Sequence, residues 1–411
     1  MKKYSFTTFL FLFSFVFATL PSYAQSDINS IKANDFYFLI DHDTQEILLS
    51  KNADTRLAPS SMTKIMTAYV VFDQIRQGRV NLDNECIIGK DAFKKRGSSM
   101  FLNYGDIVSI DNLLKGLLAV SGNDASIALA QSVGGSIDNF VALMNFKARE
   151  LGLKNSNFKN PHGLNEDGHY MSLRDLATLI SHVYQDFPEF EPYLSVHEFT
   201  YHNITQPNSN PLLKTHYDGI VGGKTGYTND GGYGVVASVK RGNRRLIAVV
   251  NKSRTSKQRT HLITQLFDYG FENYKKITLF EKDQTVTKLN TWMGNKNKVE
   301  IASNQEISFN IPKEINADAI KVKVDYETPI YAPIVKGTKV ATLKIEIKDY
   351  KTLQYSLFAK ENVQKAKFLN KVKQKLSYKL SIFYKKAVRF LYAKTQISFA
   401  NNQTRDKISQ N

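Results

Sequence analysis

The chain has 411 residues, 42% of them apolar, which is enough for at least one large core and excludes a fully disordered protein. The length favours two folded units over one. A formal net charge of +17 indicates an acidic partner, and the position of the charge decides which kind. The single cysteine, Cys86, cannot form an intramolecular disulfide, and we predict that it is a small hydrophobic side chain on a strand and not a catalytic thiol.

Residues 1–24 have the pattern of a cleaved signal peptide. Two lysines precede an almost wholly apolar stretch at residues 6–20, and Ser22-Tyr23-Ala24 supplies the small-x-small pattern of a cleavage site. The apolar stretch is shorter than the roughly 20 residues that cross a bilayer, although a short membrane anchor is the alternative interpretation. We expect a mature chain that begins near Gln25 and is exported.

Residues 25–275 are predicted to form one unit of helices and strands. The order is two short strands within 36–50, a helix from about Pro59 and, after the glycine pair at 222–223, three β-branched runs typical of an antiparallel meander. The intervening helices are expected at residues 110–120, 125–133, 143–153 and 173–187, and a last one ends near Tyr274. Strands at both ends with helices between them indicate an α+β fold with an antiparallel sheet assembled from distant parts of the chain.

Two further segments follow. Residues 276–357 contain short alternating runs and predict a small all-β domain. Residues 358–397 are predicted to form an amphipathic helix that lies on an anionic membrane surface, because apolar side chains recur every three or four residues and no Asp or Glu occurs from 362 to 403. A helix packed on the protein itself and a nucleic-acid arm are the alternatives, and export argues against nucleic acid. Residues 398–411 form a polar tail.

Ser61 and Lys64 are the first candidates for chemistry. Residues three apart share a helix face, so the amine can reach the hydroxyl, but the same spacing recurs at Ser156 and Lys159. A serine is a weak nucleophile until a base takes its proton, and a lysine is such a base only if burial and a neighbouring cation lower its pKa. Lys224 is the candidate cation.

Two more motifs accompany this pair. Ser121 and Asn123 stand in a turn between predicted helices, where the hydroxyl could relay a proton and the amide could hold a substrate carbonyl. Lys224, Thr225 and Gly226 stand on a predicted strand. Each motif alone also fits an ordinary turn, a solvated strand residue or a bulge. Their order along the chain, Ser-x-x-Lys, then Ser-x-Asn, then Lys-Thr-Gly, makes those separate explanations less favourable.

In these motifs the sequence resembles the penicillin-recognising active-serine family, and within it the D-alanyl-D-alanine carboxypeptidases, or low-molecular-mass penicillin-binding proteins. The resemblance extends from about residue 30 to 395 and includes the stretches APSSMTKIMT, SGNDASIALA, NPHGL, KTGYTNDGGYG and APIVKG. It implies a helix-and-sheet peptidase domain, a β-sandwich-like second domain and a membrane-surface anchor. The implied location is the periplasmic face of the inner membrane, and the implied partners are peptidoglycan stem peptides and β-lactam antibiotics.

The resemblance also implies a role for each motif residue. Ser61 would be acylated by the penultimate D-alanine carbonyl of a stem peptide, and Lys64 would accept its proton. Ser121 would pass a proton to the leaving amine, Asn123 would bind the peptide amide, and the charge of Lys224 would keep Lys64 deprotonated.

The oxyanion is expected between the backbone N–H of Ser61 and that of Tyr227 or Thr228, just after Gly226. Arg259 stands where the family places a cation for the terminal carboxylate, although a solvated residue at the start of a helix is the alternative. The family usually has an arginine where this chain has Ser209, so carboxylate binding would rest more on Arg259 and Thr225.

Other interpretations are less favourable. We expect no catalytic role for His162 or His169, no metal and no cofactor, because no cluster has metal-ligand spacing. A β-lactamase of the class with the most similar motifs needs Glu-x-x-Leu-Asn, but Pro161 stands at the glutamate position before Leu164-Asn165. A non-catalytic peptidoglycan-binding scaffold is the other alternative, and the intact motifs argue against it.

Overall fold

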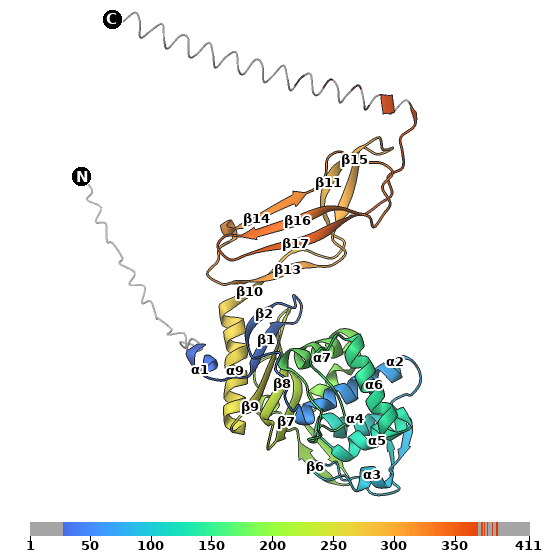
Figure 1. Ribbon diagram of the computed structural model, residues 1–411, viewed down its shortest axis with the longest axis vertical. Helices are drawn as coiled ribbons and strands as arrows, with labels where there is room; N and C mark the ends of the chain where they lie inside the picture. The colour runs from blue at the N-terminus through green and yellow to red at the C-terminus, as the bar shows by residue number, and fades with distance from the viewer. Residues whose placement is uncertain are drawn as a thin grey trace, which may run out of the picture. The chain divides into compact units, whose positions relative to one another are not determined.

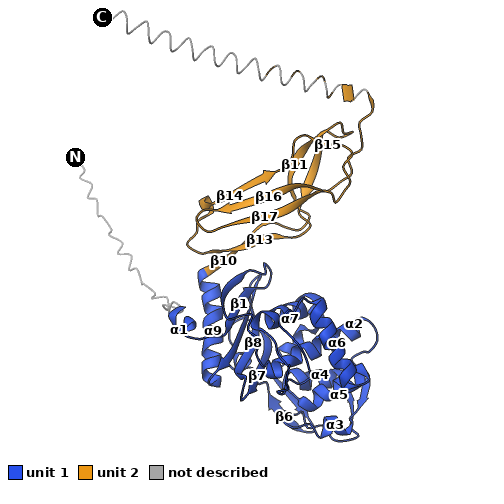
Figure 2. Ribbon diagram, viewed as in Figure 1, with its two compact units in different colours: residues 1–273 blue, residues 274–411 orange. Residues whose placement is uncertain are grey.

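The computed structural model describes residues 28–368 and the single positions 371, 372, 374, 376, 380 and 384. The chain divides into two compact units, residues 1–273 and 274–411, coloured separately in Figure 2. The predicted signal peptide and the polar tail lie outside the described residues, as do most positions of the predicted C-terminal helix.

The first unit is built around a five-stranded antiparallel sheet with the strand order β2-β1-β9-β8-β7. The two N-terminal strands join the sheet through β9, so distant parts of the chain do meet in one sheet, as the sequence predicts. Strand β7, which carries the Lys-Thr-Gly motif, lies at one edge. The strands are β1 (Tyr37–Asp41), β2 (Ile47–Lys51), β7 (Ile220–Thr228), β8 (Gly232–Arg241) and β9 (Arg244–Ser253).

Helices cover both faces of this sheet. Helix α9 (Ser256–Asn273) lies along one face, and the remaining long helices gather on the other, as Figure 1 shows. The prediction of an α+β unit is therefore confirmed. The helices of the second group are α2 (Lys64–Arg76), α4 (Ile110–Leu118), α5 (Asn123–Gly134), α6 (Ile137–Glu150) and α7 (Leu173–Asp186).

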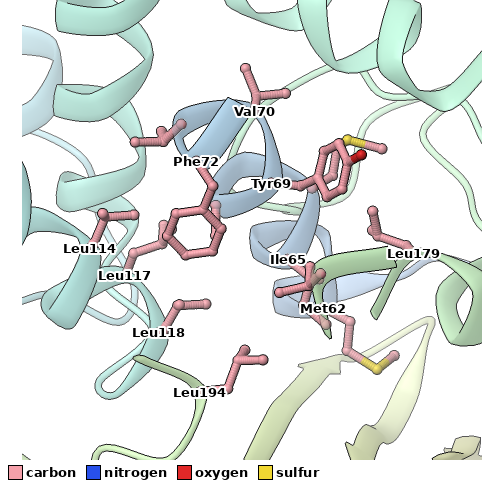
Figure 3. Close-up of a cluster of buried hydrophobic side chains, with 14 of the residues drawn as sticks. Met62, Ile65, Tyr69, Val70, Phe72, Leu114, Leu117, Leu118, Leu179 and Leu194 are labelled. Carbon is pink, nitrogen blue, oxygen red and sulfur yellow. The ribbon is translucent and has the colours of Figure 1, made fainter. Parts of the chain in front are cut away.

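Helix α2 is buried from its first residue to Gln74. Figure 3 shows its apolar side chains facing leucines of α4 and α7, and the Phe72 ring stacks on Phe190 with 4.5 Å between the centroids. Burial of a side chain such as Phe72 stabilises a fold by about 1.5–3 kcal/mol. The core thus fixes in place the helix whose first residue is Lys64.

Apart from the strand around Cys86 and the helix start near Pro59, the short elements were not expected from the sequence. They include a hairpin of β3 and β4 in which Cys86 is buried on β3, so the predicted strand position of that cysteine is confirmed. Burial also raises the pKa of the Cys86 thiol, which makes it a poor nucleophile. The short elements are α1 (Ile28–Lys32), η1 (Ser60–Thr63), β3 (Glu85–Ile87), α3 (Lys90–Phe93), β4 (Ile107–Ser109), η2 (Pro188–Leu194), β5 (Glu198–Tyr201), β6 (Ile204–Pro207) and α8 (Pro211–Lys214).

The second unit consists almost entirely of strands around its own core, which includes Val299, Phe309, Leu343 and Leu357. Strands β10 and β13 pair with each other, and six others form a sheet in the order β14-β16-β17-β12-β11-β15. The bounds are β10 (Tyr274–Phe280), β11 (Thr285–Trp292), β12 (Lys298–Ala302), β13 (Ile307–Pro312), η3 (Ala317–Ala319), β14 (Ile320–Asp325), β15 (Ile330–Tyr331), β16 (Lys339–Ile347) and β17 (Lys351–Ala359).

The C-terminal helix does not begin at residue 358. Strand β17 continues to Ala359, Val363 and Lys365 form β-bridges, and Ala366 is buried, so these residues complete the all-β unit. Helical residues are described only from Phe368. Among the described residues no single helix is long and apolar enough to cross a membrane; α5 and α6 meet that test only together, across a bend of 86°.

Candidate active site

The three sequence motifs meet at one end of α2. Ser61 lies on η1, Lys64 is the first residue of α2, Ser121 and Asn123 lie at the turn between α4 and α5, and Lys224 lies on β7. The Lys64 amine is 2.9 Å from Ser61 Oγ and 2.8 Å from Asn123 Oδ1. Four of these side chains are buried, and Ser61 is half-buried. The arrangement places one reactive hydroxyl beside a buried amine.

Two glycines allow the chain to close around η1. A Cβ on Gly226 would lie 3.0 Å from Pro59 O, so β7 passes so closely against η1 that a side chain at this position would push η1 outward. A Cβ on Gly163 would lie 1.8 Å from Ser60 O, and Gly163 also has a φ of +85°. Ser60 itself has a φ of +52°, a conformation that non-glycine residues rarely adopt. The residue before Ser61 is therefore held in a strained conformation by tight packing.

The hydrogen bonds of Lys64 define its orientation. Besides Ser61 Oγ, Nζ contacts two carbonyl oxygens, Asn123 Oδ1 and His162 O, both at 2.8 Å. A neutral amine has two hydrogens and one lone pair, and a carbonyl oxygen can only accept. The two hydrogens must therefore go to Asn123 and His162. The lone pair is left to face the Ser61 hydroxyl, which is the geometry of a base that takes the serine proton.

Burial favours the neutral form of Lys64. Its side chain is fully buried, which lowers its pKa well below the ordinary lysine value, and the nearby charge of Lys224 lowers the pKa further. Asp124 acts in the opposite direction and raises the pKa of Lys64, while Lys95 lowers it. Burial and a second cation, the two requirements inferred from the sequence, are both met.

Lys224 is itself buried on β7. Burial, followed by the charge of Arg259, lowers the pKa of Lys224 to about 7. Its amine donates to Thr225 O at 3.2 Å. The site thus contains three buried basic side chains. The charge of Arg259 lowers the pKa of Lys224, and the charge of Lys224 lowers the pKa of Lys64.

Arg259 lies in the first turn of α9 and is only 6% exposed. Its Nη2 donates to Ser256 Oγ at 2.9 Å, and its guanidinium lies 5.9 Å from the centre of the Tyr233 ring. Its Nε is buried without a hydrogen-bond partner among the described residues. A buried donor without a partner costs about 1–3 kcal/mol.

Thr225, Ser209 and Tyr227 complete the strand side of the site. The Thr225 and Ser209 hydroxyls lie 2.7 Å apart, so Ser209 bonds the motif threonine directly. Tyr227 is 52% exposed, and its ring packs on Tyr233 with 4.3 Å between the centroids. The Ser60 hydroxyl donates to Thr228 Oγ1 at 3.1 Å, which ties η1 to the end of β7.

The sequence did not reveal the part played by the NPHGL stretch. His162 supplies a backbone carbonyl to Lys64, while its ring, like that of His169, is buried. Burial lowers the pKa of His162 to about 3 and that of His169 to about 4, so both are neutral at pH 7. His169 Nδ1 accepts from the backbone N–H of Lys159, so the other ring nitrogen carries the hydrogen and donates to Thr63 Oγ1 at 2.9 Å. The His169 ring thus supports η1, the turn that carries Ser61.

A cavity of 530 Å³ borders the turn that carries Ser61, with Pro59, Gly163, Leu164 and Asp230 among the residues that line it. Because Gly163 and Leu164 directly follow His162, this space adjoins the loop that holds Lys64. Within the described ranges, no group of three or more His, Cys, Asp or Glu side chains could hold a metal ion.

Comparisons with known proteins agree with this geometry. A family model for D-alanyl-D-alanine carboxypeptidase matches residues 22–255, and a model for the C-terminal domain of penicillin-binding protein 5 matches residues 274–365. The chain is 38% identical to the D-alanyl-D-alanine carboxypeptidase DacF of Bacillus subtilis over 343 residues, which cover 82% of this chain and 87% of the relative. It is 36% identical to DacC of Escherichia coli over 371 residues, 88% of this chain and 92% of the relative.

A solved structure resembles both units. Penicillin-binding protein 5 from Haemophilus influenzae matches with a TM-score of 0.77 and 34% identity, over 81% of this chain and 98% of that one. Fold and motifs together define a penicillin-recognising serine peptidase. The chain belongs to the D-alanyl-D-alanine carboxypeptidase family.

Proposed function

We propose that this protein removes the terminal D-alanine from peptidoglycan pentapeptide stems through an acyl-enzyme on Ser61, and that β-lactams acylate the same serine. The proposal rests on the hydrogen bonds of Lys64. Its amine donates to Asn123 Oδ1 and His162 O, which leaves its lone pair facing Ser61 Oγ. A hydroxyl beside a buried neutral amine is suited to attack on a carbonyl carbon.

Acylation begins when Ser61 Oγ attacks the carbonyl carbon of the penultimate D-alanine and its proton moves to Lys64 Nζ. The oxyanion lies between the backbone N–H groups of Ser61 and of Tyr227 or Thr228. Ser121, buried at the turn with a φ of +64°, passes a proton to the leaving amine, and free D-alanine departs. Water then attacks the ester, and Ser61 regains its proton.

Asn123 is proposed here chiefly as the residue that orients Lys64. Its Oδ1 accepts from the Lys64 amine, and its Nδ2 donates to Arg96 O at 2.9 Å. Both ends of the amide therefore have protein partners, and contact with the substrate amide requires one of them to be exchanged.

The terminal carboxylate of the substrate is assigned to Arg259 and Thr225. The buried Nε of Arg259 gains a partner when a carboxylate arrives, and the Thr225 hydroxyl is held by Ser209 from the segment between β6 and α8. Lys224 contributes positive charge between this carboxylate position and Lys64. Substrate recognition and the neutrality of the base therefore depend on the same cations.

The direct test is release of D-alanine from a synthetic pentapeptide. We expect release by the chain without its signal peptide and a loss of at least about 1000-fold in Ser61→Ala, because the nucleophile is gone. Ser156→Ala is the matched control, since Ser156 begins the other Ser-x-x-Lys pair but bonds Asp175, and it should keep full activity. Penicillin acylation without D-alanine release would support the scaffold instead, and rapid penicillin hydrolysis would support a β-lactamase.

The cellular position is a further part of the proposal. The C-terminal segment has apolar residues on one face of the predicted helix and lysines on the other. In an exported chain, such a helix would bind the periplasmic surface of the inner membrane without crossing the bilayer. Among the described residues of this segment, Phe368, Leu376, Leu380 and Tyr384 are each more than half exposed, which supports this proposal.

A further inference from the structure

Asp124 is a buried carboxylate directly after Asn123, and it is only 2% exposed. Its oxygens accept from the Ser99 hydroxyl at 2.6 Å and from the backbone N–H groups of Met100 and Leu102 at 3.1 and 3.2 Å. Oδ1 also accepts from the N–H of Ala125 at 2.9 Å. A carboxylate with several such donors is a strong anchor for the segment that supplies them.

Asn123 holds the same segment from its other end. Its side-chain Nδ2 donates to Arg96 O and its backbone N–H donates to Ser98 O at 2.7 Å. The approach is close, since a Cβ on Gly97 would lie 2.6 Å from Asn123 Nδ2. Residues 96–102 and the first turn of α5 therefore form one hydrogen-bonded unit.

The Arg96 carbonyl decides which way the Asn123 amide points. A carbonyl can bond only the NH₂ end of that amide, so the oxygen end must face Lys64. If residues 96–102 moved away, the amide could rotate and present its NH₂ end to the Lys64 amine. The orientation of the base thus depends on the segment that Asp124 anchors.

We propose that Asp124 is a positioning residue for acylation, which fixes residues 96–102 so that the Arg96 carbonyl holds the Asn123 oxygen toward Lys64. The inference rests on the proposed function, because it assigns Asp124 a part in the step that Ser61 and Lys64 perform. Asp124 contacts neither the substrate nor the reacting atoms; it acts through Asn123.

The charge of Asp124 gives the proposal a distinctive readout. The charged or titratable groups that face Lys64 are Lys224 from β7, Lys95 from the adjoining segment, His162 from its loop and Asp124 from α5. Asp124 is the anion of this set and raises the pKa of Lys64. Without that charge the pKa of Lys64 falls further, so the acid limb of the acylation rate should move to lower pH.

The experiment measures the second-order rate of acylation by a fluorescent penicillin from pH 5 to 9, with thermal unfolding alongside. In Asp124→Asn we expect a rate at the optimum reduced about tenfold, because a charge-assisted anchor is lost, and an acid limb moved to lower pH. Ser99→Ala removes one donor but keeps the charge, so it should slow acylation less and leave the acid limb in place.

Asp175→Asn is the matched control. Asp175 is also a buried carboxylate that anchors a loop, with Asn155 N at 2.6 Å and Ser156 Oγ at 2.8 Å, but it is not among the charges that act on Lys64. It should lower the melting temperature and leave the acylation profile unchanged.

An Asp124→Asn profile with the wild-type acid limb would overturn the proposal, as would an equal shift in Asp175→Asn. If Asp124→Asn does not fold, Ser99→Ala decides, and an unchanged rate in that variant contradicts the anchor. Failure of the proposed function is a different result, namely wild-type protein that penicillin does not label at Ser61.

Discussion

At the residue scale, the chemistry depends on three side chains that the fold has buried against their ordinary preference. Lys64, Lys224 and Arg259 are almost fully buried, and burial lowers the pKa of each of them. Buried charges of like sign destabilise a fold. At this site the same burial lowers the pKa of the Lys64 amine next to Ser61.

This cost predicts how stability depends on pH. The pKa of folded Lys64 lies well below its ordinary value, whereas the unfolded chain holds a proton there until pH rises through about 10.5. Unfolding therefore takes up a proton, and the free energy of unfolding rises with pH by about 1.4 kcal/mol per pH unit for that group. Lys224 contributes in the same direction, since its pKa is lowered to about 7.

Lys64→Met should remove the contribution of Lys64 to this slope. Urea unfolding is to be measured between about pH 7.5 and 9. The free energy of unfolding should rise more steeply with pH in the wild type than in Lys64→Met, by the equivalent of about one bound proton. Lys159→Met is the control, as Lys159 belongs to the other Ser-x-x-Lys pair and is exposed, and it should keep the wild-type slope. Equal slopes in all three proteins would show that folded Lys64 is charged.

The sequence predicted the residues of the site but not all of their contacts. Ser61, Lys64, Asn123 and Lys224 could be chosen because their spacing and order form a known set of motifs. The His162 carbonyl and the Asp124 anchor could not, since a backbone carbonyl has no sequence signature and a buried aspartate resembles any residue of a first helical turn. Contacts between segments far apart in the chain decide both.

At the element scale, the reliability of each prediction followed the length of the element. The sheet strands and α4 to α7 span enough residues for an apolar period to appear, and the structure contains each of them. Strands β4 to β6 have three or four residues each, too few for any period, and they were missed. The predicted start of the C-terminal helix at residue 358 was too early, because β17 runs to Ala359 and Val363 and Ala366 are buried in the β unit.

At the same scale, we expect activity to require the close packing around η1. Alanine variants of two glycines can test this. Gly163 and Gly152 both have positive φ, but a Cβ at 163 would clash with Ser60 O whereas a Cβ at 152 would meet nothing within 4 Å. We expect each alanine variant to lose about 1 kcal/mol of stability through its φ. Only Gly163→Ala should also slow penicillin acylation, by about tenfold or more, because it displaces the turn that carries Ser61.

Stopped-flow acylation and urea unfolding of the two variants measure these effects. Equal acylation rates in Gly163→Ala and Gly152→Ala would show that the turn does not need this contact.

At the scale of the whole molecule, the chain combines a peptidase unit, an all-β unit and a strongly basic C-terminal segment. The residues proposed for the peptidase site lie within 61–259, and the β unit has its own core. The excess positive charge lies mostly beyond residue 362, away from the catalytic motifs in the chain. Truncation of the basic segment can therefore test membrane binding separately from catalysis.

Truncation after Lys367 should abolish membrane binding and leave the catalytic unit intact, since Val363 and Ala366 remain to complete the β unit. We expect the full chain without its signal peptide to sediment with anionic liposomes, less with added salt and little with neutral liposomes. The truncated chain should stay in the supernatant and keep its D-alanine release. Sedimentation that is insensitive to salt and to the truncation would contradict the proposed anchor.

The central claim is that Lys64 activates Ser61 and no other hydroxyl. Mass spectrometry of the protein after reaction with penicillin, followed by proteolysis, locates the adduct directly. Our account predicts one acyl group per chain, on Ser61, and none in Lys64→Met. An adduct on Ser60, Ser121 or any other residue, or undiminished acylation of Lys64→Met, would contradict it.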